Sequence, residues 1–301
     1  IKKFKEKIVL DHFNLSLEKG DVLGLIGPNG CGKTTSIMCM LSLLKYDSGT
    51  IEVFGKKDIS NEYEIKKKIG IVPQELAVFN NLTVKENIDY FCGLYISNKN
   101  ERKRLVNEAI EFTGLQSHEK MLEKKLSGGL KRRLNIACGI SHKPELVILD
   151  EPTVAVDAQS RKFILDGIKN LAENGSSILY TTHYLDEAEY LCNKISIMDN
   201  GKNILTGDMQ TLINGVSVKE KITVVGFIKP EIISILEKQD EVIDVETKEN
   251  QVTFNYSTDT GNIKKLIYLL DENNVVYEEI FSKKPKLEDI FLEMTGKELR
   301  E

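Results

Sequence analysis

The chain has 301 residues, 41% of them hydrophobic and 29% charged, which is enough for one large globular domain and a smaller one. No window holds about 18 consecutive apolar residues, so the sequence offers no candidate for a membrane-spanning helix. The formal net charge is −5 with Lys and Arg spread along the chain, and this lack of a basic patch argues against a nucleic-acid-binding protein.

A glycine-rich loop follows the first short apolar run, residues 21–26. The loop reads Gly27-Pro28-Asn29-Gly30-Cys31-Gly32-Lys33-Thr34-Thr35. The order strand, glycine loop, helix is the context that the Walker A pattern requires, and the glycines allow the positive φ at which successive N–H groups curl around a phosphate. Lys33 is expected to neutralise the β- and γ-phosphates, and the Thr34 hydroxyl to bind Mg²⁺. The sequence therefore predicts ATP binding by residues 27–35.

The next predicted elements are helices. Residues 82–88 and 101–112 space their apolar side chains with helical periodicity and without the alternation of strands. Thr83 and Glu86 have the spacing of a capping box, which predicts that a helix begins at this threonine.

The most informative stretch lies between the glycine loop and a pair of acids and reads Leu126-Ser127-Gly128-Gly129-Leu130. Its glycines leave backbone N–H groups bare for a γ-phosphate, and the following helix directs its positive end to the same place. The pattern is typical of ATPases that complete their active site with a second copy, so Ser127, Gly128 and Gly129 are predicted to contact the partner's nucleotide. Taken alone, the stretch also fits an ordinary turn before a helix. For the three basic residues at 131–133, a solvated helix surface is favoured over phosphate binding.

Two acids follow a predicted buried strand. Four aliphatic residues, 146–149, precede Asp150 and Glu151, which fits a parallel strand that delivers both carboxylates at the edge of a sheet where ligands bind. Asp150 is expected to hold Mg²⁺ and Glu151 to activate the attacking water as general base; solvated acids on a core strand are the alternative. His183 follows a similar run, 178–182, and is predicted to hydrogen-bond a γ-phosphate oxygen. This assignment rests on its position within the whole set, since a lone histidine is more often structural.

The sequence changes character after Gly207. It predicts strands at 222–227, 242–247, 251–256 and 275–281 and helices at 231–237 and 262–272. The order β-α-β-β-α-β matches a ferredoxin-like unit, so residues 216–301 are expected to form a small α+β domain. These residues include no His or Cys, and their acids are scattered, which predicts a packed core without a catalytic cluster.

Together these motifs resemble the ATP-binding subunit of an ABC transporter, across roughly residues 4–210. The resemblance implies an α/β fold with a P-loop NTPase core of the ABC ATPase type at residues 1–215, and a helical subdomain inserted at about 76–142. It implies that Gln74 contacts Mg²⁺ and that Asp157 contacts the active site of the opposite subunit. Phe4 lies where the family places an aromatic that stacks on adenine, with Val9 near the ribose and base; an ordinary aromatic on a strand is the alternative.

Two departures separate the chain from the importers of this family. Importers usually carry Gln after Leu-Ser-Gly-Gly, where this chain has Leu130 and three basic residues, and a Ser-Gly-Leu-Asp type of sequence where it has Val154-Ala155-Val156-Asp157. Both replacements, with the pair Ser160-Arg161, resemble the exporter branch that moves drugs, lipids or polysaccharides. Loss of the usual glycine at position 155 is expected to stiffen this loop.

The resemblance implies a transport-coupled ATP hydrolase that uses ATP and Mg²⁺. Two ATPase subunits, either two copies or this chain with a relative, would close head to tail over two nucleotides and drive an integral membrane permease. The expected location is peripheral, at the cytoplasmic face of the cell membrane, where the five cysteines are reduced. Two alternatives stay open, namely an importer ATPase with a regulatory C-terminal domain and a soluble ABC ATPase outside transport.

Overall fold

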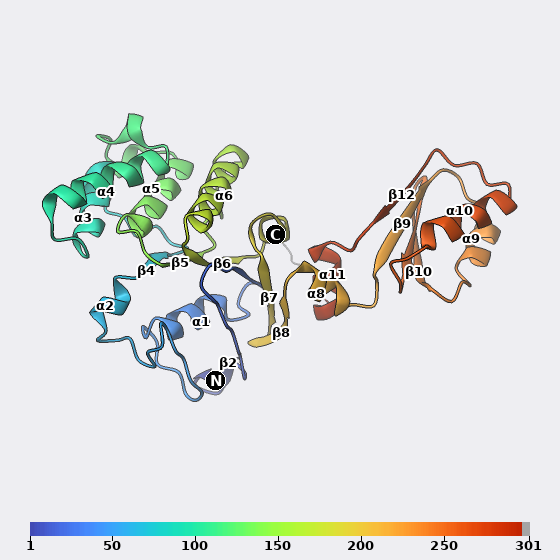
Figure 1. The fold of residues 1–301 in the computed structure, drawn as a ribbon, viewed down its shortest axis with the longest axis horizontal. Helices are drawn as coiled ribbons and strands as arrows, with labels where there is room; N and C mark the ends of the chain where they lie inside the picture. The colour runs from blue at the N-terminus through green and yellow to red at the C-terminus, as the bar shows by residue number, and fades with distance from the viewer. Residues whose placement is uncertain (297–301) are drawn as a thin grey trace. The chain divides into compact units, whose positions relative to one another are not determined.

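The computed structural model describes residues 1–296, which form two units, Ile1–Thr206 and a second unit that begins at Gly207 (Figure 1). The first unit contains a six-stranded sheet with the order β4-β5-β6-β3-β7-β8. Its strands are β3 (Val22–Ile26), β4 (Ile69–Val72), β5 (Leu146–Asp150), β6 (Ser177–Thr182), β7 (Lys194–Asp199) and β8 (Lys202–Gly207). From β4 to β7 every neighbouring pair is parallel. The carboxyl ends of β3, β5 and β6 therefore meet at one edge.

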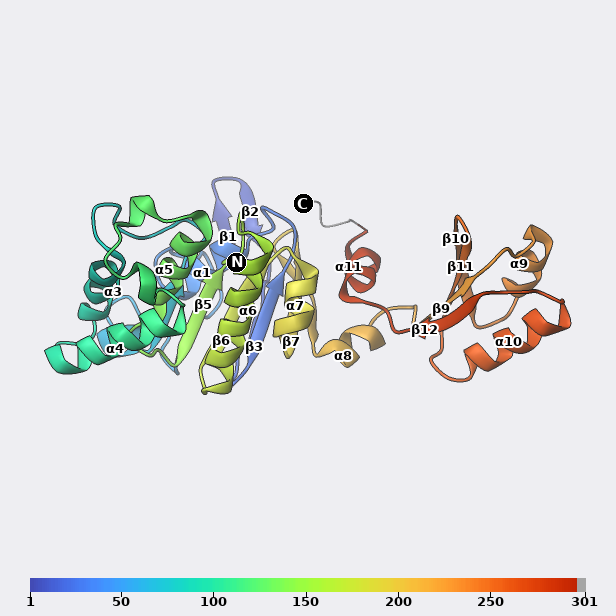
Figure 2. The same cartoon turned by 90° about the horizontal axis from the view of Figure 1, so that it is seen from above.

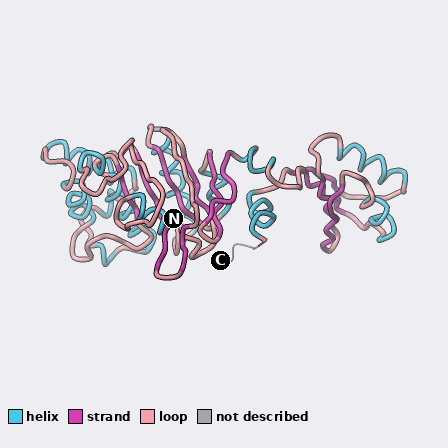
Figure 3. The backbone as a smooth tube through the Cα atoms, turned by 90° about the horizontal axis from the view of Figure 1, so that it is seen from below, coloured by secondary structure: helices cyan, strands magenta, loops and turns pink. Residues whose placement is uncertain are grey.

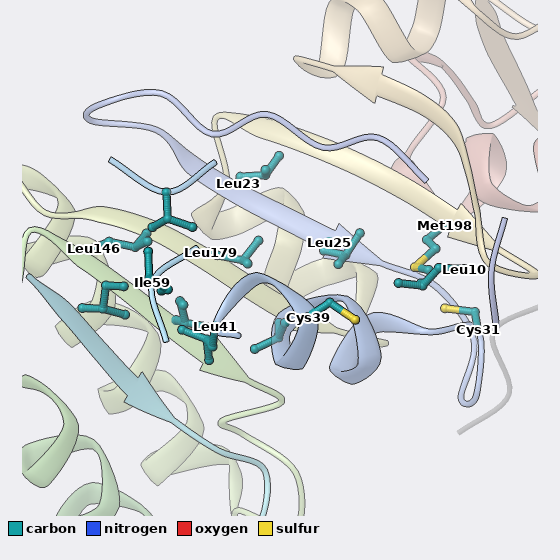
Figure 4. Packing of buried hydrophobic residues seen from close by; sticks show 14 residues of the cluster. Leu10, Leu23, Leu25, Cys31, Cys39, Leu41, Ile59, Leu146, Leu179 and Met198 are labelled. Carbon is teal, nitrogen blue, oxygen red and sulfur yellow. The ribbon is translucent and has the colours of Figure 1, made fainter. Parts of the chain in front are cut away.

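Helices cover both faces of this sheet. The helices of the first unit are α1 (Lys33–Met40), α2 (Tyr63–Lys66), α3 (Val84–Gly93), α4 (Lys99–Phe112), α5 (Gly128–Ile140), α6 (Ala158–Glu173) and α7 (Leu185–Leu191). Leu23 of β3 packs in one cluster with Cys39 of α1 (Figure 4). Its neighbour Val22 packs in another cluster with Ile164 of α6, and Figure 2 shows α6 in front of the strands of this sheet. Because successive strand residues point to opposite faces, burial on both sides explains the continuous apolar runs in the sequence.

A separate apolar cluster holds α3, α4 and α5 together. It includes Ile88 of α3, Leu105 of α4 and Leu134 of α5. The predicted capping box starts α3, because Thr83 Oγ1 accepts from Glu86 N at 3.2 Å and the Glu86 carboxylate accepts from Thr83 N at 2.8 Å. Both helices predicted between the glycine loop and Leu126 are confirmed, and this cluster gives them a core of their own.

The second unit contains a four-stranded sheet with the order β10-β11-β9-β12, in which every neighbouring pair is antiparallel. Its elements are α8 (Met209–Asn214), β9 (Glu220–Val225), α9 (Pro230–Leu236), β10 (Val242–Lys248), β11 (Gln251–Tyr256), α10 (Asn262–Glu272), β12 (Glu279–Lys283) and α11 (Leu287–Thr295). Leu236 of α9 and Leu266 of α10 pack against Phe254 of β11. Figure 3 shows the strands of each sheet in magenta and the helices in cyan.

The largest difference from the predicted boundaries of the second unit concerns its last strand. The last strand was expected at 275–281, but β12 begins at Glu279, which pairs with Val225. The reason is that β9 ends at Val225 and the next residue, Gly226, turns the chain with a φ of 144°. Residues before Glu279 therefore lie beyond the end of the ladder.

Candidate functional site

The glycine loop takes a backbone that its glycines make possible. It leaves β3 after Ile26 and enters α1 at Lys33. Gly32 has a φ of 117°, and a Cβ on Gly27 would lie 2.2 Å from the carbonyl oxygen of Met198. A side chain at either position would clash or strain the loop. The loop thus delivers the uncapped amino terminus of an eight-residue helix, where backbone N–H groups and the helix dipole favour a phosphate.

The remaining loop residues differ in exposure. Asn29 and Gly30 are exposed, Pro28 and Thr35 are half-buried and Cys31 is buried. Burial raises the pKa of the Cys31 thiol, so this thiol remains protonated at neutral pH.

Lys33 is buried between the loop and the acid that follows β5. Its side chain is 5% exposed, and Nζ donates to Gly27 O at 2.8 Å and to Pro28 O at 3.4 Å. The same Nζ lies 3.3 Å from Glu151 Oε1. A cation is therefore fixed where the loop and the end of β5 meet, as the predicted phosphate contact requires.

Asp150 accepts hydrogen bonds from two threonines. Thr34 Oγ1 donates to Asp150 Oδ2 at 2.8 Å, and Thr181 Oγ1 donates to Asp150 Oδ1 at 2.5 Å. Hydrogen bonds between oxygen atoms thus link Asp150, at the end of β5, to the start of α1 and to the end of β6. A hydroxyl and a carboxylate in contact are the donor set that Mg²⁺ takes in nucleotide sites, so these residues fit the ion.

Glu151 is the point where the predicted catalytic residues converge. It is 6% exposed, and Gln74 Nε2 donates to Glu151 Oε2 at 3.4 Å. His183 Nδ1 lies 3.2 Å from the same oxygen, without the alignment of a hydrogen bond. The backbone of Glu151 has a φ of 48°, and its N–H donates to Thr181 O at 3.1 Å and to Thr181 Oγ1 at 3.0 Å. Burial and this fixed backbone hold the carboxylate beside Gln74, His183 and Lys33.

The Ser-Gly-Gly stretch forms the amino terminus of α5. Ser127 is the N-cap, and its Oγ accepts from Leu130 N at 3.4 Å. Ser127 and Gly128 are exposed, whereas Gly129 is buried against the start of α6. A Cβ on Gly129 would lie 2.4 Å from Ser160 Oγ and 3.1 Å from Asp157 Oδ2. The second glycine is therefore required for the close approach of α5 to the loop that carries Asp157.

The predicted ATP contacts fall into two clusters within one chain. Among residues 1–296, no hydrogen bond or ion pair links Ser127, Gly128 or Gly129 to the loop 27–35. The Ser-Gly-Gly stretch lies instead beside Asp157. This aspartate is exposed, and its Oδ1 accepts from Ser160 N at 2.9 Å. Each cluster therefore contains part of the predicted nucleotide contacts.

The prediction of a solvated surface for residues 131–133 is wrong. Arg132 is 7% exposed, and its Nη1 donates to Gln74 O at 2.8 Å and to Pro73 O at 3.2 Å. Asn135, one turn further, donates to Pro73 O at 3.2 Å and accepts from Ala77 N at 3.1 Å. Side chains three apart lie on the same face of a helix, so this face of α5 holds the loop that carries Gln74.

The two neighbours of Arg132 also contact protein. Lys131 Nζ lies 2.9 Å from Glu123 Oε1, and this carboxylate is 3% exposed. The Arg133 guanidinium stacks 3.9 Å from the ring centroid of Phe163 on α6. The basic run therefore joins α5 to three surrounding segments.

Phe4 and Val9 lie on the antiparallel hairpin of β1 (Lys2–Phe4) and β2 (Lys7–Leu10). Phe4 is 47% exposed, and Lys2 Nζ lies 4.8 Å from its ring centroid. Val9 is adjacent to the glycine loop, since its carbonyl oxygen would be 3.0 Å from a Cβ on Gly32. Phe4 thus keeps an open aromatic face, while Val9 borders the loop.

Sequence reasoning missed Glu187, which is 1% exposed on α7. Its Oε2 accepts from the hydroxyls of Thr153 at 2.9 Å, Tyr180 at 2.7 Å and Thr182 at 3.0 Å. The signal available in the sequence was an acid next to Ala188 on the apolar side of a short helix. Such a buried carboxylate requires partners, and those partners come from segments distant in sequence.

A P-loop between a parallel strand and a helix, two acids on an adjacent strand and a separate Ser-Gly-Gly helix start together define a P-loop ATPase of the ABC type. The family model described as ABC transporter matches residues 10–154. The linearmycin resistance ATP-binding protein LnrL of Bacillus subtilis strain 168 is 37% identical over 306 residues, which cover 100% of this chain and 97% of the relative. The Nod factor export ATP-binding protein I of Sinorhizobium fredii strain NGR234 is 30% identical over 300 residues, with coverage of 100% and 85%. The chain therefore belongs to the ABC transporter family, among its ATP-binding proteins.

Solved structures agree with this assignment. The dimeric structure of MJ0796, a bacterial ABC transporter cassette, has a TM-score of 0.63 and 25% identity, and the match covers 69% of this chain and 95% of that one. The cbiO1 protein of Clostridium perfringens, part of the ABC transporter complex cbiONQ, has a TM-score of 0.61 and 27% identity, with coverage of 69% and 88%. The predicted ABC ATPase fold and class of enzyme are confirmed. Within residues 1–296, no helix has the length and apolar character needed to cross a membrane.

Proposed function

We propose that this chain is the ATP-hydrolysing subunit of an exporter, and that it closes over ATP with a second ATPase subunit. The observation that carries this proposal is the division of the site. Lys33, Glu151 and His183 form one cluster, whereas Ser127 and Asp157 belong to another without a polar link to the first among residues 1–296. Two chains arranged head to tail would bring the exposed Ser127 to the partner's glycine loop.

The export direction rests on the relatives and on sequence. The two relatives described above are named for linearmycin resistance and for Nod factor export. The importer alternative is disfavoured by residues 130–133 and 153–161, whose sequence resembles that of the exporter branch. A drug, lipid or polysaccharide is the proposed class of cargo. The soluble, non-transport alternative has no specific observation in its favour.

The proposed chemistry is positioning and charge stabilisation. The N–H groups of residues 27–35 and the Lys33 ammonium would hold the phosphates and take up charge that develops on the γ-phosphoryl group. Glu151, already buried beside Lys33, would accept a proton from the attacking water. His183 and Gln74 both lie beside Oε2 of Glu151. Both side chains would therefore be within reach of the γ-phosphate.

Mg²⁺ and the adenine have proposed partners in the same chain. The residues that would hold the metal are Thr34, Asp150 and Gln74, whose side chain donates to Glu151, the residue next to Asp150. The chemistry that Mg²⁺ supplies when bound is neutralisation of phosphate charge. Phe4 would stack on adenine and Val9 would border the ribose, which the exposed ring and the position of Val9 beside Gly32 support.

The helical subdomain, residues 76–142, is the proposed contact with an integral membrane permease. Support comes from an aromatic group at its surface, in which the ring centroids of Phe79 and Tyr90 lie 4.9 Å apart and those of Phe79 and Phe91 lie 5.9 Å apart. Phe79 is 45% and Tyr90 48% exposed, and large exposed aromatics are typical of protein interfaces. Binding there would place the ATPase peripherally at the cytoplasmic face of the membrane.

Residues 216–301 are proposed to be a ferredoxin-like accessory domain that follows an ATPase domain at residues 1–215. The element order from β9 to β12 and the sheet order β10-β11-β9-β12 support this type of fold, because both are those of a split βαβ unit. The end of this predicted domain, residues 297–301, lies outside the described residues.

Replacing Glu151 with Gln tests the proposal. The variant should bind ATP and lower kcat by about 10²- to 10⁴-fold, as loss of a general base does, and it should accumulate as a stable dimer with MgATP. Binding, turnover and oligomeric state are measured on the full chain by nucleotide titration, phosphate release and light scattering. The matched control is Glu145→Gln, which changes an exposed acid directly before β5 and should leave all three values unchanged. Wild-type turnover in Glu151→Gln would refute the assigned role, and a wild-type chain that binds no ATP would refute the proposed function.

A further inference from the structure

Glu187 is a buried acid that the catalytic roles above do not use. Its Oε2 accepts three hydroxyl hydrogen bonds, from Thr153, Tyr180 and Thr182, at distances of 2.7–3.0 Å. Three donors on one oxygen of a buried side chain hold the carboxyl group in a fixed position. Burial and the neighbouring Glu187 hold the pKa of Tyr180 well above its usual value, so the phenol stays a donor.

The partner Thr182 connects this carboxylate to the turn that contains His183. Thr182 Oγ1 donates to Glu187 and accepts from Tyr184 N at 2.9 Å. The Thr182 hydroxyl is therefore bonded both to α7, through Glu187, and to the backbone of Tyr184, the residue after His183. Thr182 therefore links Glu187 to the backbone of the turn that contains His183.

The partner Thr153 connects the same carboxylate to the turn after Glu151. Thr153 is 0% exposed, and its carbonyl oxygen accepts from Val156 N at 3.3 Å. In the same turn, Glu151 O accepts from Val154 N at 3.4 Å. Glu187 therefore also fixes the segment between Glu151 and the loop of Asp157.

Arg161 adds a charged link to the start of α6. Its Nε lies 3.5 Å from Glu187 Oε1, without the alignment of a hydrogen bond. The guanidinium lies 4.5 Å from the ring centroid of Tyr184, and that ring lies 4.2 Å from the ring of His183. Since Asp157 is the N-cap of α6, one carboxylate contacts the segments that carry Glu151, Asp157 and His183.

We propose that Glu187 is a positioning residue for ATP hydrolysis, which sets the relative placement of Glu151 and His183 through Thr153 and Thr182. This inference rests on the proposed function. Glu187 is bonded to the segments that carry Glu151 and His183. Its removal should therefore change the placement of these two residues more than the binding of nucleotide. Among residues 1–296, Glu187 makes no hydrogen bond or ion pair with the glycine loop, which would hold the phosphates.

The test replaces Glu187 with Gln, which keeps the size of the side chain but removes its charge and one acceptor oxygen. We expect kcat to fall roughly tenfold while the KM for MgATP stays within about twofold, since charge-assisted hydrogen bonds weaken but the phosphate loop is unchanged. The matched control is Glu189→Gln, on the same helix with an exposed side chain, and it should keep both values. An unchanged kcat in Glu187→Gln, or an equal rise in KM in place of the fall in kcat, would overturn the inference.

A second pair of variants covers the case in which Glu187→Gln fails to fold. Thr182→Val removes the hydroxyl with little change of shape, whereas Thr182→Ser keeps it. We expect kcat to fall in Thr182→Val and to recover in Thr182→Ser, with KM steady in both. Equal loss in the two variants would assign Thr182 a packing role only and would refute the link to His183.

A readout without turnover separates this inference from the proposed function. The chain has four histidines, and the ring ¹⁵N signal of His183 is assigned by comparison with His183→Gln. We expect this signal to move in Glu187→Gln and to stay in Glu189→Gln. A signal that does not move would refute the positioning role, whether or not the chain hydrolyses ATP; a wild-type chain without hydrolysis would refute the proposed function alone.

Discussion

Arg132→Met removes a buried charged donor from the loop of Gln74 and keeps an unbranched side chain that suits a helix. In the native chain Arg132 Nη1 donates to Gln74 O at 2.8 Å and to Pro73 O at 3.2 Å. Pro73 O retains Asn135 Nδ2 at 3.2 Å after the substitution, whereas Gln74 O loses this guanidinium donor. The perturbation therefore affects chiefly the attachment of Gln74 to α5.

The expected loss follows from these two bonds. Hydrogen bonds from charged donors contribute about 1.5–3 kcal/mol net each, but Pro73 O keeps a partner and water reaches the exposed Gln74. We therefore expect the free energy of unfolding of the first unit to fall by about 2 kcal/mol, which corresponds to a fall in Tm of about 4–8 °C for a unit of this size. Burial lowers the pKa of Arg132, yet the guanidinium stays charged at neutral pH.

Scanning calorimetry and urea unfolding of the full chain measure this loss. The control is Arg104→Met on α4, the same substitution at a side chain that is 57% exposed and pairs with Glu108 on the surface. Exposed pairs of this spacing contribute only about 0.3–0.5 kcal/mol, so the control should stay near the wild type. Equal losses at the two positions would refute the argument that burial and the loop contacts decide the effect of Arg132.

Two further predictions concern backbone strain and thiols. Ala155 has a φ of 59°, so Ala155→Gly should relieve about 1 kcal/mol of backbone strain in the folded state. The greater freedom of the unfolded chain should offset about 0.5 kcal/mol of this gain, so the free energy of urea unfolding should rise by about 0.5 kcal/mol. A glycine variant less stable than the wild type would contradict this. Burial raises the pKa of all five thiols, so the folded chain keeps protons that the unfolded chain releases above about pH 8.5. Stability is then complete below that pH and falls as the pH rises further, which unfolding curves at increasing pH check. The thiols should also react with a disulfide reagent far more slowly when folded than in urea, and equal rates would refute their burial.

The predicted phosphate loop and the two acids after β5 could be placed from the sequence because their signals are local. Gly32 is needed at a backbone position with a φ of 117°, and Lys33 follows it directly at the start of a helix. Asp150 and Glu151 follow a strand whose residues are all buried. In each case the chain within a few residues defines both the conformation and the chemistry, so the order of residues was sufficient.

The surroundings of α5 could not be predicted in the same way. Three consecutive basic residues are typical of a solvated surface, yet Arg132 contacts a loop 58 residues earlier in the chain. Glu187 likewise accepts from Thr153, which is 34 residues away. Periodicity gives the face of a helix on which a side chain lies, but not the segment that packs against that face.

The sequence by itself determined the phosphate loop, the pair of acids, the Ser-Gly-Gly helix start and the family, because each is a short pattern with its own backbone requirement. Tertiary structure decided that Glu151 meets Lys33, Gln74 and His183 in one place while Ser127 does not. It also decided that Glu187 and Arg132 are buried. These contacts depend on how distant strands and helices approach one another, and the free energy of packing that brings them together is shared over the whole core.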